Sequence, residues 1–320
     1  MRKTGIILSA LCTALMAASC VEDYSPTINS ADGHKIIVDA LLTTDTTAHC
    51  VKITTSAPYG TASEDIPAVS GARVTITGPD GTVELKEDGT TGRYYTPEDY
   101  SGKEGQEYKL VVDAVDDGSP VHFEASDIMP PSGVRADGFD YYKMADSLWS
   151  FAIWGQDLPG IVSHYAADLC VHGRKHDFGK WVFIDGYQMF DGNYLNGGEY
   201  LFYSCFDILQ DEDEPLTPLV EGDVVTMYFY SMSDFFYSYI TAVLNESMAH
   251  FPMFSAQPAN LPTNISGGAM GCFALAHLTK MDVVIDDPER TRIDMLRDHN
   301  MLKWSPASGS DAPAQPLPLP

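Results

Sequence analysis

Three residues of types that bind zinc or copper lie close together in the middle of the chain: Cys170, His172 and His176. The histidines are four residues apart, a spacing that places both imidazoles on one side only if the segment is helical. Here the segment is expected to leave a strand and enter a loop, and a fourth ligand is unidentified. We therefore predict no metal site, with these three residues as the weak candidates, and expect hydrogen-bonded or solvent-exposed histidines.

Other chemistry-bearing motifs are missing from the sequence. It has no Gly-x-Ser-x-Gly elbow, no His-Glu-x-x-His pair and no phosphate-binding loop with its lysine. The acidic run from Asp211 to Pro215 lacks the spaced oxygen ligands and central glycine of a calcium loop. We predict a protein that is not an enzyme and needs no cofactor. A glycan- or peptide-active hydrolase remains the less favoured alternative, because two carboxylates among 45 acidic residues would leave no local trace.

The first twenty residues predict export and lipid attachment. Arg2 and Lys3 precede an apolar run from Gly5 to Leu15 that is too short to span a bilayer as a helix. The run ends in Ala17-Ala18-Ser19-Cys20, which resembles the site where bacterial lipoprotein signal peptides are cut. We predict a signal peptide over residues 1–19 and acylation of Cys20, since several acyl chains anchor a protein durably. An ordinary secretory signal with an incidental cysteine is the alternative.

Residues 20–33 are expected to form a polar linker that carries the lipid. Val21, Glu22 and Asp23 resemble an acidic tag that directs lipoproteins to the outer face of the outer membrane. The chain has a formal charge of −26, so it would repel the phosphates of nucleic acid and make no basic contact with anionic lipid. We expect it to reach the membrane through the lipid on Cys20 alone.

Four cysteines remain in the folded part: Cys50, Cys170, Cys205 and Cys272. Their spacings match no metal knuckle, and sequence cannot choose among the three possible disulfide pairings. Cys170, Cys205 and Cys272 lie in apolar runs, where a buried thiol is as consistent as a disulfide. The disulfide state stays open.

The elements that would position any site are mostly strands. Over residues 34–128, alternating runs rich in Val, Ile, Thr and Tyr predict an immunoglobulin-like sandwich. The clearest pair is 72–77 and 82–86, joined by Gly78-Pro79-Asp80-Gly81, which predicts a hairpin. Tyr108 precedes a further strand and is either a tyrosine corner or an ordinary half-buried tyrosine.

Met129-Pro130-Pro131-Ser132-Gly133 interrupts this pattern, and we place a domain boundary there. The second domain, over residues 129–285, is predicted to be β-rich, with strands near 148–154, 165–171, 181–184, 199–206 and 224–230. One amphipathic helix is expected at about 232–249, begun by a capping pair of Ser231 and Asp234. Because the pattern changes from strand-like to helical within 224–244, we reject a transmembrane span there. Residues 286–320 are expected to form a short helix after Pro288 and a disordered tail.

The most distinctive string runs from Pro258 to Ala274 and reads PANLPTNISGGAMGCFA. Together with the step Gly222-Asp223-Val224-Val225, the aromatic helix and the lipoprotein signal, it resembles an uncharacterised Bacteroidota outer-membrane lipoprotein family known only as a domain of unknown function. The resemblance covers roughly residues 20–285. Cys272 departs from it, standing where an apolar or aromatic residue is expected. We expect the three glycines of the string to permit a tight turn before a strand over 273–278.

The resemblance implies a partner of TonB-dependent outer-membrane transporters. We therefore predict a surface-exposed, lipid-anchored accessory without catalytic activity that binds a glycan or peptide ligand for such a transporter. A structural or adhesive surface protein is the alternative, because fold alone does not distinguish these functions.

Overall fold

Sheets make up most of the protein, which confirms the mainly β fold class predicted from the sequence. The computed structural model describes residues 34–57, 61–62, 65–144, 148–160, 164–171, 174–175, 189–191, 198–207, 219–248 and 261–302. The predicted signal peptide, Cys20 and its linker, the strand expected at 181–184 and the tail beyond residue 302 lie outside these ranges. Among the described helices, none is both long and apolar enough to cross a membrane.

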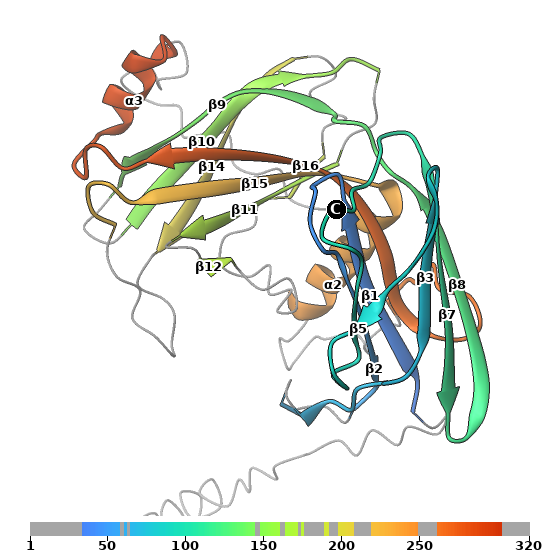
Figure 1. The fold of residues 1–320 in the computed structure, drawn as a ribbon. Helices are drawn as coiled ribbons and strands as arrows, with labels where there is room; N and C mark the ends of the chain where they lie inside the picture. The colour runs from blue at the N-terminus through green and yellow to red at the C-terminus, as the bar shows by residue number, and fades with distance from the viewer. Residues whose placement is uncertain are drawn as a thin grey trace, which may run out of the picture.

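The largest sheet in the described part runs the length of the molecule and has nine strands (Figure 1). Its spatial order is β12 (Arg174–Lys175), β11 (His164–Val171), β15 (Val224–Met232), β16 (Met270–Val284), β1 (Ile36–Thr43), β2 (Cys50–Thr55), β6 (Arg93–Tyr95) and β5 (Lys86–Glu87), with β13 (Met189–Asp191) also paired to β11. Neighbouring strands of this sheet are antiparallel in the described part, except β1 and β16, which run parallel.

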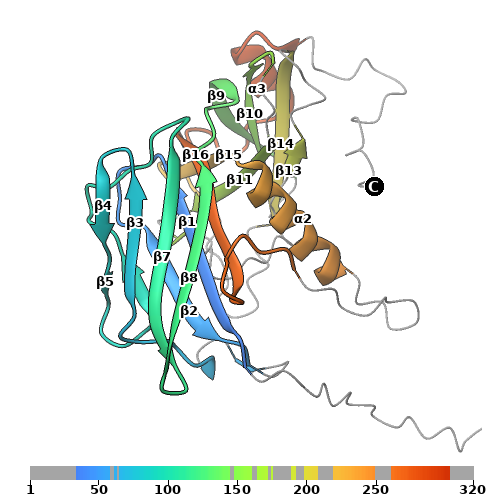
Figure 2. The same cartoon turned by 90° about the vertical axis from the view of Figure 1, so that its right-hand side faces the viewer.

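Two smaller sheets cover one face of this long sheet. At one end lies the four-stranded sheet of β4 (Gly81–Glu84), β3 (Arg73–Gly78), β7 (Glu107–Asp116) and β8 (Ser119–Ile128), which forms the front layer of the sandwich in Figure 2. At the other end lies the three-stranded sheet of β14 (Glu199–Asp207), β10 (Leu148–Asp157) and β9 (Val134–Lys143). The hairpin predicted around Pro79-Asp80 is confirmed as β3 and β4, with Gly78 opposite Gly81.

Strand β16 contributes to both cores, because alternate residues of a strand face the same side. Phe273 and Leu275, near its start, pack in the first core between the long and four-stranded sheets. Met281 and Val283, near its end, pack against the second core beneath the three-stranded sheet. Residues 129–133 do separate β8 from β9 in the chain, but the two halves share this one continuous strand.

The described part of the distinctive string, from Leu261 onward, closes the fold. The side chain of Asn264 donates to the Phe273 carbonyl and accepts from the Phe273 amide, at 2.9 and 3.0 Å. Gly271 has a φ of +94°, and a Cβ there would lie 2.2 Å from the Val38 carbonyl oxygen. Only glycine fits where β16 approaches β1 this closely, and the turn expected before the strand is confirmed at Gly267 and Gly268. The strand itself is longer than the predicted 273–278.

Helix α2 (Asp234–Met248) lies on the opposite face of the long sheet from the small sheets (Figures 1 and 2). Phe236 and Ile240 are fully buried against Ala274 and Ala276, whose small side chains let the helix approach. The strand-then-helix prediction is confirmed, but the predicted capping pair is wrong. Ser231 lies within β15, and the Phe236 amide donates to the Oγ of Ser233 instead, at 3.2 Å.

The last described element is α3 (Arg292–Asp298), which packs on the second half of the protein. It begins at Thr291, whose hydroxyl caps the helix in a reciprocal pair with Asp294, rather than at Pro288 as the sequence suggested. Met295 and Leu296 are buried against Tyr142 of β9. The helix is therefore a docked part of the fold and not an extension of the tail.

Candidate functional site

A cavity of about 390 Å³ opens at one end of the sandwich. It lies between the β3–β4 turn and the segment that leads into β7. The residues that line it are Pro79, Asp80, Gly81, Val83, Pro97, Asp99, Tyr100, Ser101, Lys103 and Tyr108. Ligand cavities are commonly about 300–1,000 Å³, so this one could take a small ligand or one end of a larger one.

Two contacts hold the segment 97–103 in place beside the cavity. The Nζ of Lys103 pairs with the carboxylate of Asp80 at 2.6 Å, between two exposed side chains. The backbone N–H of Lys103 donates to the buried Tyr108 hydroxyl at 2.7 Å. This bond from a tyrosine back to the chain just upstream has the character of a tyrosine corner, which decides between the two readings of Tyr108. The buried phenol therefore shapes the wall of the cavity.

Two tyrosines, Tyr100 and Tyr108, line the cavity. Burial, with Tyr108 and Asp80 nearby, raises the pKa of Tyr100 to about 12. Burial also raises the pKa of Tyr108. Both phenols are therefore protonated at neutral pH. The Tyr108 hydroxyl accepts the Lys103 amide, and both tyrosines line the cavity.

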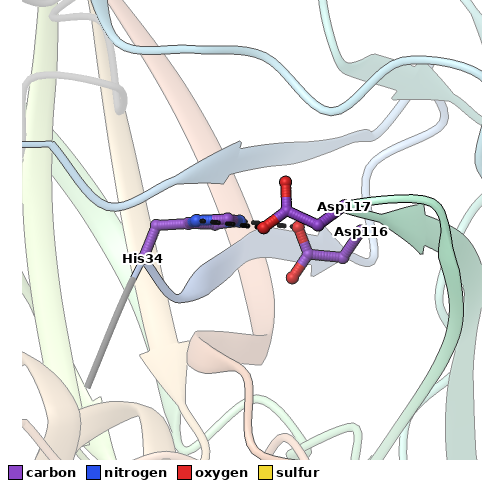
Figure 3. A group of neighbouring side chains, drawn as sticks. All are labelled: His34, Asp116 and Asp117. Atoms are coloured by element: carbon purple, nitrogen blue, oxygen red, sulfur yellow. Dashed lines mark hydrogen bonds and ion pairs between the residues drawn. The ribbon is translucent and has the colours of Figure 1, made fainter.

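A second group of polar side chains lies at the other end of the sandwich (Figure 3). His34, just before β1, faces Asp116 at the end of β7 and Asp117 in the β7–β8 turn. The imidazole Nε2 lies 2.6 Å from Oδ1 of Asp116, and Nδ1 lies 3.9 Å from Oδ2 of Asp117. The hydrogen bond to Asp116 raises the pKa of His34. One donor atom from each residue falls within 4.8 Å of the others.

Strand β7 separates the two groups. Tyr108 lines the cavity near the start of β7, and Asp116 meets His34 at its end. Eight residues of extended strand span about 25 Å. The cavity therefore lies at the end of the sandwich away from His34, the first described residue after the predicted lipid linker.

A comparison of the sequence with models of known families assigns this chain to a family. A model of the family described as "Domain of unknown function (DUF4249)" matches residues 21–281. The chain belongs to the DUF4249 family. The expected membership of an uncharacterised family is thus confirmed, and the match spans both cores and β16 up to Met281.

Solved structures similar to this DUF4249 protein are distant. A DUF4785 family protein from Legionella pneumophila matches with a TM-score of 0.23 and 8% identity over 62% of this chain and 52% of that one. The FN1–FN3 domains of chicken CNTN1 match with 0.23 and 12% over 61% and 59%, and the BSP domain of a biofilm associated protein with 0.18 and 15% over 61% and 27%. The chain thus spans about half the length of the first of these, and scores this low carry no argument. No curated protein matched the chain.

The sequence candidates of this DUF4249 protein divide between described and undescribed residues. Cys170 is buried in β11, packed in the cluster beneath α2, whereas His172 and His176 lie outside the described part, as do Cys20 and the acidic run 211–215. The predicted absence of a metal site at Cys170 therefore stays a prediction.

The disulfide state of three cysteines can be read from the structure. Cys50, Cys170 and Cys272 form no disulfide. Cys272 lies under α2, and burial holds its pKa well above the usual range, so it is a neutral thiol. The pairing of Cys205, which lies in β14, falls outside the described part.

Neither group of polar residues was singled out from the sequence. The cavity is built from a turn and a loop, which the hairpin prediction located without showing that they face each other. His34 meets Asp116 across 82 residues, a contact without a local signal. Only the Asp117-Gly118 turn, with φ of +47° and +77°, has a recognisable hairpin pattern.

Proposed function

We propose that this DUF4249 protein is a lipid-anchored binding protein on the outer face of the outer membrane, and a non-catalytic accessory of a TonB-dependent transporter. The observation that carries the proposal is the position of the cavity. It lies at the end of the sandwich opposite His34, the residue that follows the predicted linker from Cys20. A ligand held there would face away from the anchor.

The lining suits a small polar ligand, such as an end of a glycan or a peptide. The lining includes the phenols of Tyr100 and Tyr108 and the carboxylate of Asp99, while the carboxylate of Asp80 is paired with Lys103. A few placed polar groups in a concave site give orientation and specificity to a ligand. The formal charge of −26 disfavours phosphate-rich ligands and favours neutral or cationic ones.

Affinity purification from gently solubilised outer membranes tests the partner. The tagged, lipidated protein is recovered and co-eluting proteins are identified by mass spectrometry. Stoichiometric recovery of one TonB-dependent transporter is the expected result. The matched control is Cys20→Ala, which lacks the acylation site and should lose both membrane attachment and the transporter.

Recovery of the lipoprotein without any transporter would overturn the accessory role. Binding to host matrix or cells by that same preparation would then support the adhesive alternative. Membrane attachment that survives Cys20→Ala would overturn the lipid anchor, independently of the transporter result.

A further inference from the structure

The chain immediately before β1 is tied to the opposite sheet of the sandwich. His34 precedes a strand of the nine-stranded sheet, whereas Asp116 and Asp117 belong to the end of β7 and its turn in the four-stranded sheet. In Figure 3 both carboxylates lie beside the same edge of the imidazole. The three donor atoms lie within 4.8 Å of one another.

Within the described ranges, the two carboxylates of this group have one histidine as their basic partner. Among the described residues, neither Asp116 nor Asp117 has a lysine or arginine within 4.0 Å, and His34 is the cation-forming partner of each. Asp116 and Asp117 are two adjacent carboxylates in a chain with a formal charge of −26. A bound cation would offset this repulsion.

A second histidine, in the four-stranded sheet, also contacts two acidic residues but does not form a group of three close donor atoms. His122 lies 2.6 Å from Asp113 and 3.3 Å from Glu124. Glu124 is also paired with Lys109, at 2.8 Å. In the described part of the chain, only the His34 group brings three such donors together. The His122 group therefore serves as an internal control.

We propose that His34, Asp116 and Asp117 form a binding site for a first-row divalent transition-metal ion such as Zn²⁺. One imidazole nitrogen and two carboxylate oxygens make three protein ligands, and the exposed position leaves water for the remaining coordination. An imidazole ligand favours zinc or copper over calcium and magnesium, which prefer all-oxygen sites. The ion would fasten the residue before Lys35 and β1 to the β7–β8 turn. This inference does not depend on the transporter proposal.

Isothermal titration of the full-length, metal-free protein with Zn²⁺ tests the site. Because other donors in the chain can also bind Zn²⁺, the comparison is with the double variant Asp116→Asn/Asp117→Asn. Asparagine tolerates the positive φ of residue 117, so the turn is preserved. We expect the double variant to lose one equivalent of Zn²⁺, or roughly tenfold or more in affinity at that site. His34→Ala should do the same.

Two controls make the test decisive. His122→Ala should retain the wild-type stoichiometry, and Ca²⁺ in place of Zn²⁺ should give no saturable heat that depends on Asp116 and Asp117. Equal Zn²⁺ binding by wild type and the double variant would overturn the proposal. So would a loss in His122→Ala as large as the loss in His34→Ala. Matching melting curves of the metal-free variants verify that they are folded.

Discussion

Tyr108→Phe tests how the cavity wall is held. The substitution deletes only the hydroxyl that accepts a hydrogen bond from the Lys103 backbone amide at 2.7 Å, and it leaves the ring in the first core. Losing that bond and leaving its partially buried donor unpaired should lower the free energy of unfolding by about 1–3 kcal/mol. Urea denaturation followed by fluorescence measures the stability. Hydrogen exchange of the segment 97–103 measures whether it has loosened.

Tyr100→Phe is the matched control, because Tyr100 lines the same cavity but the Lys103 amide donates to the Tyr108 hydroxyl instead. Its stability should stay within about 0.5 kcal/mol of wild type. If the cavity binds ligand, Tyr100→Phe should still weaken binding. Unchanged exchange at 97–103 in Tyr108→Phe, together with an unchanged urea midpoint, would refute the tyrosine-corner account of the wall.

Three further predictions concern the shared strand and its surroundings. Gly271→Ala places a Cβ 2.2 Å from the Val38 carbonyl oxygen and should lower the free energy of unfolding by at least about 2 kcal/mol in a thermal or urea melt. Gly268→Ala, with a similar φ but open space around its Cβ, should lower it by about 1–2 kcal/mol. Equal decreases for the two variants would contradict the close-approach argument. Tyr141→Phe removes a hydroxyl that donates to the Asp286 carboxylate at 2.7 Å and accepts hydrogen bonds from the amides of Asp286 and Asp287 at 2.9 Å. It should lower the free energy of unfolding by about 2–4 kcal/mol in urea denaturation. A decrease below about 1 kcal/mol would contradict this role. Burial raises the pKa of Asp39, against the opposing effect of Lys52, so the protein loses stability as the pH rises from the unfolded pKa near 3.8 through the folded pKa. Asp39→Asn should therefore raise the urea midpoint at pH 7 and lose that advantage at pH 3. A lower midpoint at pH 7 would show that the pair with Lys52 dominates.

Local chemistry made parts of this fold readable from the sequence. Alternation on both sides of Pro79-Asp80 identified β3 and β4, since both strands and their turn lie within one short segment. The change of period near Ser233 likewise located β15 and α2. The capping residue was misplaced by two positions, because Ser231 and Ser233 are both good caps and only strand pairing excludes Ser231.

Long-range contacts made other parts unreadable. Strand β9 was not predicted, because Gly138, Asp140 and consecutive tyrosines obscure its alternation. The parallel pairing of β1 with β16 joins residues more than 200 positions apart. The His34 group is hidden for the same reason, since two carboxylates and a histidine become neighbours only when the two sheets pack. The cavity follows from the mutual placement of a turn and a loop.

The parallel pairing of β1 with β16 also has a consequence for biogenesis. The first core contains Phe273 and Leu275, so the sandwich begun at Ile36 cannot be completed until nearly the whole chain has emerged. Contacts of such large sequence separation form slowly, because the loop must close before they contribute. For a chain threaded across a membrane from its N-terminus, premature folding would block passage. If the protein is exported as proposed, this order of strands would keep its leading half incomplete during transit, and the sandwich would close only when β16 arrives.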